Sequence, residues 1–240
     1  MHLRFRTPGG TVILRNCRIV IAIIVVSSLA ACATTVKVAP SATFQWTSPT
    51  KRLILVEPDV ELYEMRAAGE LEPRADWTET ATAFIAQDVA RGLAAHSVEL
   101  VQPGVLTDHH EIQLSRLHGA VGDAVLLHLY AFPLPNKGDA LDWTLGPGTN
   151  DMRAHYGADY ALFVTVRDSY TTTGRAIMML GAAMLGIGLQ GGQQIAFASL
   201  VDLRTGNIVW FNRIMNNSGD LRTAVPAQKT VDNLLESFPL

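Results

Sequence analysis

Histidine and carboxylate side chains gather in the stretch His109-His110-Glu111, and His118 follows eight residues after His110. Imidazole and carboxylate groups bind zinc and other divalent metals when several of them converge on one point. On a helix, however, adjacent residues diverge, and His110 and His118 would lie two turns apart. We therefore predict no metal site and interpret this stretch as the solvated, capped beginning of a helix.

A second group with acid–base potential is Asp159, Asp168 and Tyr170, which bracket the most strand-like stretch of the chain. Carboxylates there can act as general acid or base if they face a substrate. Polar residues beside strands more often cap turns and bond the sheet edge. The chain also lacks the G-x-S-x-G and H-E-x-x-H motifs of two hydrolase classes. The sequence thus predicts no catalytic residue, and this group is the alternative if the protein is an enzyme.

Residues 186–191 match the G-x-G-x-x-G pattern of dinucleotide-binding proteins. That site needs a strand before the glycines, a helix after them and an acidic residue about 20 positions downstream. Here an apolar stretch without strand character precedes the glycines, strand-like residues follow them, and Asp202 is too close. We therefore predict no cofactor.

The two cysteines are Cys17 and Cys32, and Cys32 ends a segment that is typical of a secretory signal. Arg15 and Arg18 precede a run of 13 apolar and small residues at positions 19–31. This run is shorter than the roughly 20 residues of a membrane-spanning helix. We predict that residues 1–31 are a cleaved signal peptide, which leaves the domain without a thiol for a disulfide, a zinc site or catalysis.

The residues Leu29-Ala30-Ala31-Cys32 resemble the lipobox of bacterial lipoproteins. The resemblance implies that Cys32 receives a diacylglycerol thioether and that its amino group is acylated after cleavage. Several acyl chains anchor a protein stably, whereas one chain is marginal. Ala33, rather than aspartate, follows the cysteine, which in this class implies sorting to the outer membrane. The expected location is the outer membrane, with the domain facing the periplasm.

The mature chain divides into a lipidated N-terminus with a tether at residues 32–50 and a domain at residues 51–240. The tether is rich in Thr, Ser, Ala and Pro and has no hydrophobic periodicity. An apolar run at 51–56, a helix to about residue 95 and a strand at 98–101 predict a β-α-β unit. Capping boxes at Asp76 and Asp108 predict the starts of two helices.

The second half of the domain is predicted to be rich in strands. We expect a loop at residues 133–150, a turn at Gly206-Asn207 and a short C-terminal helix. The strands are expected at residues 160–166, 194–201 and 208–214. This order predicts an α/β fold: a single domain with a mixed β-sheet flanked by helices.

In three strand-and-turn patterns, the sequence resembles those of a group of outer-membrane lipoproteins that share the fold of the curli secretion channel subunit. The patterns are LILV at 53–56, ADYALFV at 158–164 and VDLRTGNIVW at 201–210. The N-terminal domain of the Tol-system β-propeller protein and the lipoprotein activators of penicillin-binding proteins also have this fold. The resemblance covers most of residues 51–215 and implies a non-enzymatic role in envelope assemblies. A shared fold does not transfer a particular role.

Residues 174–192 form an apolar, glycine-rich insertion, and residues 176–189 contain no charged side chain. As a helix, these residues would span about 21 Å, which is less than the bilayer core. They also lack the alternation of a membrane-spanning β-hairpin. Two interpretations stay open: a helix buried against the sheet, or an exposed segment that docks on the membrane or another subunit. The candidate interaction residues are Met178, Met179, Leu180, Met184, Leu185 and Leu189.

The 240-residue chain has a net charge of −3, which becomes −7 once the four arginines of residues 1–31 are removed. Nucleic-acid binding depends on clustered Lys and Arg, so we predict no nucleic-acid partner. The expected function is non-enzymatic binding or assembly in the cell envelope. The expected partners are the membrane, through the lipid on Cys32, and envelope proteins or further copies of the chain. A subunit of a secretion or pore-like oligomer and an enzyme acting on an envelope component are the alternatives.

Overall fold

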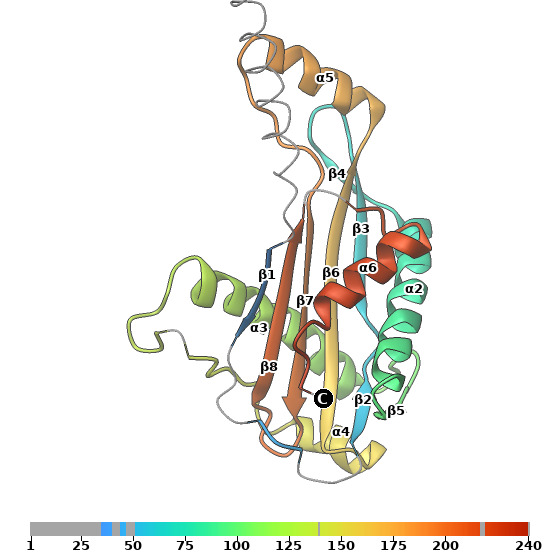
Figure 1. Ribbon diagram of the computed structural model, residues 1–240, viewed down its shortest axis with the longest axis vertical. Coiled ribbons are helices and arrows are strands. Elements are labelled where there is room, and N and C mark those ends of the chain that lie inside the picture. Colours follow the sequence, from blue (N-terminus) through green and yellow to red (C-terminus); the bar gives the residue numbers. More distant parts are fainter. Residues whose placement is uncertain (1–34, 40–43, 47–50, 139, 217–218, 240) are drawn as a thin grey trace, which may run out of the picture. The chain divides into compact units, whose positions relative to one another are not determined.

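The computed structural model describes residues 35–39, 44–46, 51–138, 140–216 and 219–239. These residues form one mixed eight-stranded sheet and five helices (Figure 1). The predicted α/β fold, with helices flanking a mixed sheet, is therefore confirmed. The predicted signal peptide and Cys32 lie outside the described residues. No helix within the described part of the chain is long and apolar enough to span a membrane.

The central strand of the sheet is β6 (Tyr160–Thr171), which has twelve residues. Three strands follow on one side of β6, each antiparallel to its neighbour. They are β7 (Gln194–Asp202), β8 (Ile208–Asn216) and the edge strand β1 (Thr35–Ala39). The turn between β7 and β8 uses Gly206 at a φ of 79°, a backbone conformation that glycine adopts without strain.

On the other side of β6, two strands follow one another along the same edge. β2 (Arg52–Leu55) pairs with the beginning of β6, and β3 (Asp59–Met65) pairs with its end, both in parallel orientation. The edge is completed by β5 (Glu99–Val101), parallel to β2, and β4 (Leu71–Pro73), antiparallel to β3. Between β2 and β3 the chain leaves the sheet at Glu57-Pro58, where proline has no N–H to donate to a ladder.

Helices cover both faces of the sheet (Figure 1). On one face lie α2 (Ala75–Ala94) and α6 (Ala224–Leu234), and on the other lie α3 (His109–Tyr130) and α4 (Thr149–Tyr156). The fifth helix, α5 (Thr173–Met184), lies beyond the end of β6 and buries only Arg175. It therefore covers neither face of the sheet.

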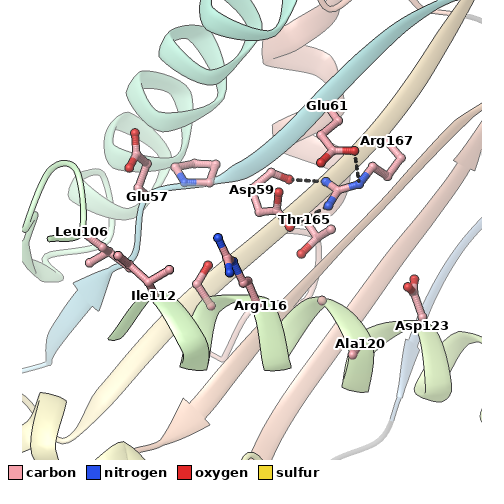
Figure 2. Close-up of a pocket in the computed structure, with 13 residues that line it drawn as sticks. Glu57, Asp59, Glu61, Leu106, Ile112, Arg116, Ala120, Asp123, Thr165 and Arg167 are labelled. Atoms are coloured by element: carbon pink, nitrogen blue, oxygen red, sulfur yellow. Dashed lines mark hydrogen bonds and ion pairs between the residues drawn. The ribbon is translucent and has the colours of Figure 1, made fainter. Parts of the chain in front are cut away.

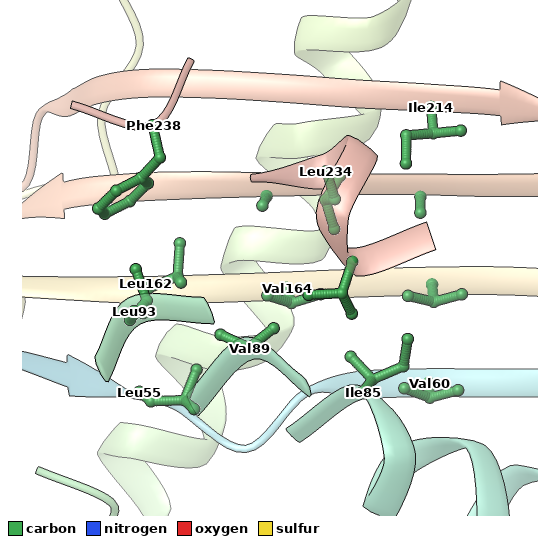
Figure 3. Packing of buried hydrophobic residues seen from close by; sticks show 14 of the residues in the cluster. Leu55, Val60, Ile85, Val89, Leu93, Leu162, Val164, Ile214, Leu234 and Phe238 are labelled. Carbon is green, nitrogen blue, oxygen red and sulfur yellow. The ribbon is translucent and has the colours of Figure 1, made fainter. Parts of the chain in front are cut away.

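Alternating apolar residues of the strands separate the two cores. In β2, Leu53 and Leu55 face α2 and α6, whereas Ile54 faces α3. Figure 3 shows the first core, in which α2 residues such as Ile85 and Leu93 pack on strand residues. The predicted β-α-β unit is thus confirmed. β2 and β5 pair in parallel, and the apolar stripe of α2, which connects to β5, packs on the sheet.

The two predicted capping boxes have different outcomes. The Asp108 carboxylate accepts hydrogen bonds from the N–H groups of His110 (2.9 Å) and Glu111 (3.1 Å), so this helix start is confirmed. The N-cap predicted at Asp76 is wrong, because the observed N-cap is Arg74, two residues earlier, and α2 begins at Ala75. The Asp76 carboxylate instead accepts hydrogen bonds from the Arg74 guanidinium at 2.9 and 3.1 Å.

The structure places described elements within the stretches that were predicted as a tether and as a loop. Residues 35–39 of the tether form β1, and Phe44 and Trp46 pack edge-on against Tyr160 at 5.3 and 5.1 Å between ring centroids. β3 and β4 were not predicted as strands, and α4 begins within the stretch predicted as a loop.

Candidate functional site

The apolar insertion forms α5, and the interpretation of this segment as a buried helix is wrong. Six large apolar side chains of this region are between 48% and 79% exposed. We name this group the α5 surface: Ile177, Met178, Leu180, Met184, Leu185 and Ile187. Of the predicted interaction residues, Met179 and Leu189 are the exceptions, because both are partly buried. Three members of the surface, Ile177, Leu180 and Met184, have the spacing of one helical stripe.

The base of α5 is attached to the domain by the buried Arg175. Its guanidinium donates hydrogen bonds to the carbonyl oxygens of Ala67 (3.2 Å), in the β3–β4 turn, and of Gln190 (2.9 Å), after the helix. The Thr172 hydroxyl caps the helix by accepting from the N–H of Arg175. The cation therefore joins both ends of the insertion to a neighbouring turn.

The chain returns from α5 to the sheet by a close approach at Gly192. A Cβ atom at this position would lie 2.1 Å from the carbonyl oxygen of Ser169, so only glycine fits without movement of the backbone. The Gly192 N–H donates to the Thr171 hydroxyl at 3.1 Å, and the Gln193 N–H donates to the Ser169 hydroxyl at 3.0 Å. These bonds hold the returning segment against the end of β6.

We expect Arg175→Ala to accelerate amide hydrogen exchange in α5 at least roughly tenfold, because the guanidinium makes two hydrogen bonds and a charged donor contributes about 1.5–3 kcal/mol to each. Exchange in β6 and β7 should stay unchanged, since their ladder does not involve this side chain. Mass-spectrometric exchange measures both. Arg116→Ala is the matched control, because Arg116 is exposed and bonds to no other described residue. Equal rates in the Arg175 variant and wild type would contradict the attachment.

A second candidate site is a cleft of about 620 Å³ between α3, β3 and β6, which we call the α3 cleft (Figure 2). Its size is within the 300–1,000 Å³ range of small-molecule sites. It begins where the chain leaves the sheet at Glu57-Pro58. Polar and charged residues line much of it: Glu57, Asp59, Glu61, Ser115, Arg116, Asp123, Thr165 and Arg167.

Arg167 organises the carboxylates on the sheet side of the α3 cleft. Its guanidinium contacts the Asp59 carboxylate at 2.7 Å and the Glu61 carboxylate at 3.3 Å (Figure 2). The Tyr63 hydroxyl donates to Glu61, and this bond raises the pKa of Tyr63. Arg116 reaches into the cleft from α3 without such a partner among the described residues. No histidine or cysteine lines the cleft, so a polar ligand site is the chemistry that its lining supports.

The α3 cleft was not predicted from the sequence. Asp59, Glu61 and Tyr63 alternate with apolar residues, which is a strand signal of period two that could have indicated β3. Arg167 lies 108 residues after Asp59, and only the parallel pairing of β3 with β6 joins them.

The residues that the sequence offered for acid–base chemistry, Asp159, Asp168 and Tyr170, lie in two separate places. Asp159 pairs with Arg153 at 2.7 Å, before the start of β6. Asp168, near the other end, accepts hydrogen bonds from the Tyr170 hydroxyl (2.7 Å) and the Gln194 amide (2.9 Å). Nine residues of extended strand separate the two carboxylates by about 30 Å, so they cannot act on one substrate. The cavity beside Asp168 is only about 120 Å³.

Burial raises the pKa of Asp168 to about 6, although the two hydrogen bonds oppose the shift. The Tyr170 hydroxyl in turn accepts from the Leu221 N–H at 2.7 Å, and the Arg222 guanidinium lies 4.2 Å from the Tyr170 ring centroid. The Gln194 amide oxygen also accepts a hydrogen bond from the hydroxyl of the buried Thr230 of α6. The network thus fastens α6 to the sheet, which supports the predicted bonding role of Asp168.

The interpretation of residues 109–118 as a solvated stretch is wrong for Glu111 and His118, which are 5% and 1% exposed. Glu111 accepts hydrogen bonds from Tyr156 (2.8 Å) and contacts the His155 ring nitrogen (3.0 Å) of α4. His118 lies between α3 and the sheet, 2.9 Å from the Ser199 hydroxyl and stacked on Phe163. Burial lowers the pKa of His118 to about 3, so the ring is neutral.

Within the described residues, no group of three or more His, Cys, Asp or Glu side chains is placed to hold a metal ion. The glycines of residues 186–191 follow α5 and precede β7. A dinucleotide site has the opposite arrangement, with a strand before the glycines and a helix after them. The α3 cleft and the α5 surface are the two candidate binding surfaces that we consider further.

Comparison with known proteins identifies solved structures of distant similarity. No protein-family model and no curated protein matches the chain. PelC of Paraburkholderia phytofirmans, solved as a dodecamer, is 13% identical over 84% of this chain and 96% of its own, with a TM-score of 0.38. The lipoprotein GNA1162 from Neisseria meningitidis is 15% identical over 78% and 96%, with a TM-score of 0.33. The C-terminal domain of LpoB from Salmonella enterica is 14% identical over 72% and 87%, with a TM-score of 0.27.

Proposed function

We propose that this chain is a lipoprotein of the outer membrane that acts by binding or assembly rather than by catalysis. The observation that carries the proposal is the α5 surface. Soluble proteins rarely expose contiguous large apolar patches unless these meet a partner or a membrane. Here six such side chains occur together on an element fixed by Arg175 and Gly192.

The polar groups of the domain agree with this proposal. Arg167 is paired with two carboxylates, and Asp168 is bonded within a network that fastens α6. Glu111 and His118 are buried in contacts between α3 and its neighbours. These residues therefore have roles in folding that need no substrate.

The lipid anchor is tested by the mass of the N-terminal peptide of the mature protein, purified from membranes. We expect a peptide that begins at Cys32 and carries the mass of the attached acyl chains. The full-length Cys32→Ala variant is the control, and it should yield no acylated peptide. A mature peptide that begins elsewhere, or an unmodified Cys32, would contradict the anchor.

The α5 surface is tested by a photo-crosslinking amino acid at Met184 in cells, with mass-spectrometric identification of the products. Met184 is 76% exposed, so the substitution leaves the core intact. We expect crosslinks that are absent when the same amino acid replaces the exposed Asn150 of α4. Equal crosslinking at both positions would mean that the α5 surface has no specific contact.

We further expect the double variant Leu180→Asp and Leu185→Asp to lose most of the Met184 crosslinks while its stability changes by less than about 0.5 kcal/mol. Both leucines are exposed, at 62% and 79%, so the aspartates meet water in the free domain and oppose only docking. Thermal unfolding measures the stability. Val105→Asp with Val225→Asp is the matched control, because these valines are 73% and 77% exposed elsewhere. Unfolding of the leucine variant would contradict the exposed position and mean that the segment belongs to the core.

A further inference from the structure

The register of the sheet places the beginning of β1 at the same end of the domain as α5. Thr35 is opposite Met215 in β8, Met215 is opposite Ile195 in β7, and Ile195 is opposite Arg167 in β6. β6 continues only to Thr171 before α5 begins. Since β1 runs antiparallel to β8 from Thr35 to Ala39, Thr35 is the end of β1 that lies toward α5 (Figure 1).

The site of the lipid is three residues before Thr35. Three residues of fully extended chain span at most about 11 Å. Acyl chains on Cys32 would therefore enter a bilayer within about 11 Å of the first residue of β1. Thr35 is level with Arg167 in the sheet. The four residues from Arg167 to Thr171 extend β6 about 13 Å beyond that level, toward α5. The first residue of β1 and the α5 surface consequently lie toward the same end of the sheet.

The size and composition of the α5 surface favour a lipid surface over a second protein chain. A stable protein interface buries about 800 Å² on each partner and uses about 20–30 residues a side. The uncharged segment has only 14 residues, at positions 176–189. A bilayer requires no matching pocket, and uncharged apolar side chains enter its interface readily. The segment is too short to cross the bilayer, so it would lie at its boundary.

We propose that α5 and the residues that follow it, to Leu189, insert into the membrane interface as a second contact beside the lipid on Cys32. This inference rests on the proposed function, because it needs the lipid anchor to define the membrane side. Two attachments at one end would fix the orientation of the domain. The α3 cleft, which lies along α3 and β3, would then be held at a constant height above the bilayer.

The test uses full-length, lipidated protein with Leu180→Cys, labelled with an environment-sensitive fluorophore. Labelling is specific, because Cys17 leaves with the signal peptide and Cys32 is blocked by its thioether. The protein is reconstituted into vesicles of phosphatidylethanolamine and phosphatidylglycerol that contain nitroxide-labelled lipid. We expect a blue shift of the emission and quenching by the nitroxide. Asn150→Cys, in α4 at the other end of the sheet, is the control, and its emission should stay that of a label in water.

Four other results would overturn the inference. Protein that floats with the vesicles but keeps an unquenched Leu180 label leaves the lipid anchor in place and removes the second contact. Protein that does not float removes the anchor and, with it, the inference. A label that leaves water without lipid quenching, in proportion to protein density, identifies a second copy of the chain as the occupant. Quenching at both positions would mean that the domain has no fixed orientation.

Discussion

Replacing Gly122 by alanine is expected to destabilise the domain by about 2–3 kcal/mol, because α3 packs on the sheet through this position. A Cβ atom at Gly122 would lie 2.0 Å from Cε2 of Phe197 and within 2.7 Å of two further ring atoms. Phe197 is 2% exposed and stacks on Phe211 at 5.7 Å between ring centroids. The ring therefore cannot turn away without displacing its neighbours.

The destabilisation is measured by urea unfolding of the wild type and the variant. Gly181→Ala in α5 is the matched control, because Gly181 is also a helical glycine but its Cβ would meet nothing within 4 Å. This control should gain up to about 1 kcal/mol of local helix stability from the higher helix propensity of alanine. A Gly122 variant as stable as wild type would show that α3 is further from the sheet than the structure places it.

Elements with a local signal were predictable from the sequence, and the start of α3 is the clearest case. Asp108 is followed by two N–H groups that its carboxylate can reach, whatever the rest of the chain does. β7 and β8 were likewise predicted, since their apolar residues continue over most of their length. The cap and the apolar runs each lie within a short stretch of sequence, so they can be recognised without knowing which distant residues pack against them.

The exposure of α5 was not predictable, because it depends on where β6 ends. The predicted strand stopped at Val166, before the polar residues Arg167 and Asp168. In the structure, β6 continues to Thr171 because β3 pairs with this half of it and Arg167 finds Asp59. The longer strand carries α5 beyond the faces that the other helices cover. The apolar composition of α5 alone therefore favoured burial, whereas the length of β6 places the helix where it is exposed.

The α3 cleft was unpredictable for a related reason, since its lining comes from three elements. β3 supplies Asp59 and Glu61, β6 supplies Arg167, and α3 supplies Arg116. No short motif contains this set. The break between β2 and β3 at Glu57-Pro58 also contributes to the lining.

Asp168 should make the domain less stable as the pH rises from about 4 to about 6. The ordinary pKa of the carboxyl is 3.8, and burial raises it to about 6 in the folded protein. Well below pH 3.8 the group is protonated in both states and causes no difference. Between the two values the native state keeps a proton that the unfolded state has released, so the free energy of unfolding falls with rising pH. Above pH 6 the full difference, about 3 kcal/mol, opposes folding.

The contribution of Asp168 is isolated by comparing Asp168→Asn with wild type in urea unfolding at pH 3 and pH 7. The asparagine oxygen can still accept from Tyr170 and Gln194, so we expect the variant to gain about 3 kcal/mol relative to wild type between these values. Asp220→Asn is the control of opposite sign, because Arg222 lowers the pKa of Asp220. The stability from that pair is present above the ordinary carboxyl pKa and is lost only below it. A pH-independent difference for Asp168→Asn would mean that this carboxylate is hydrated, in which case the network that fastens α6 is open to water.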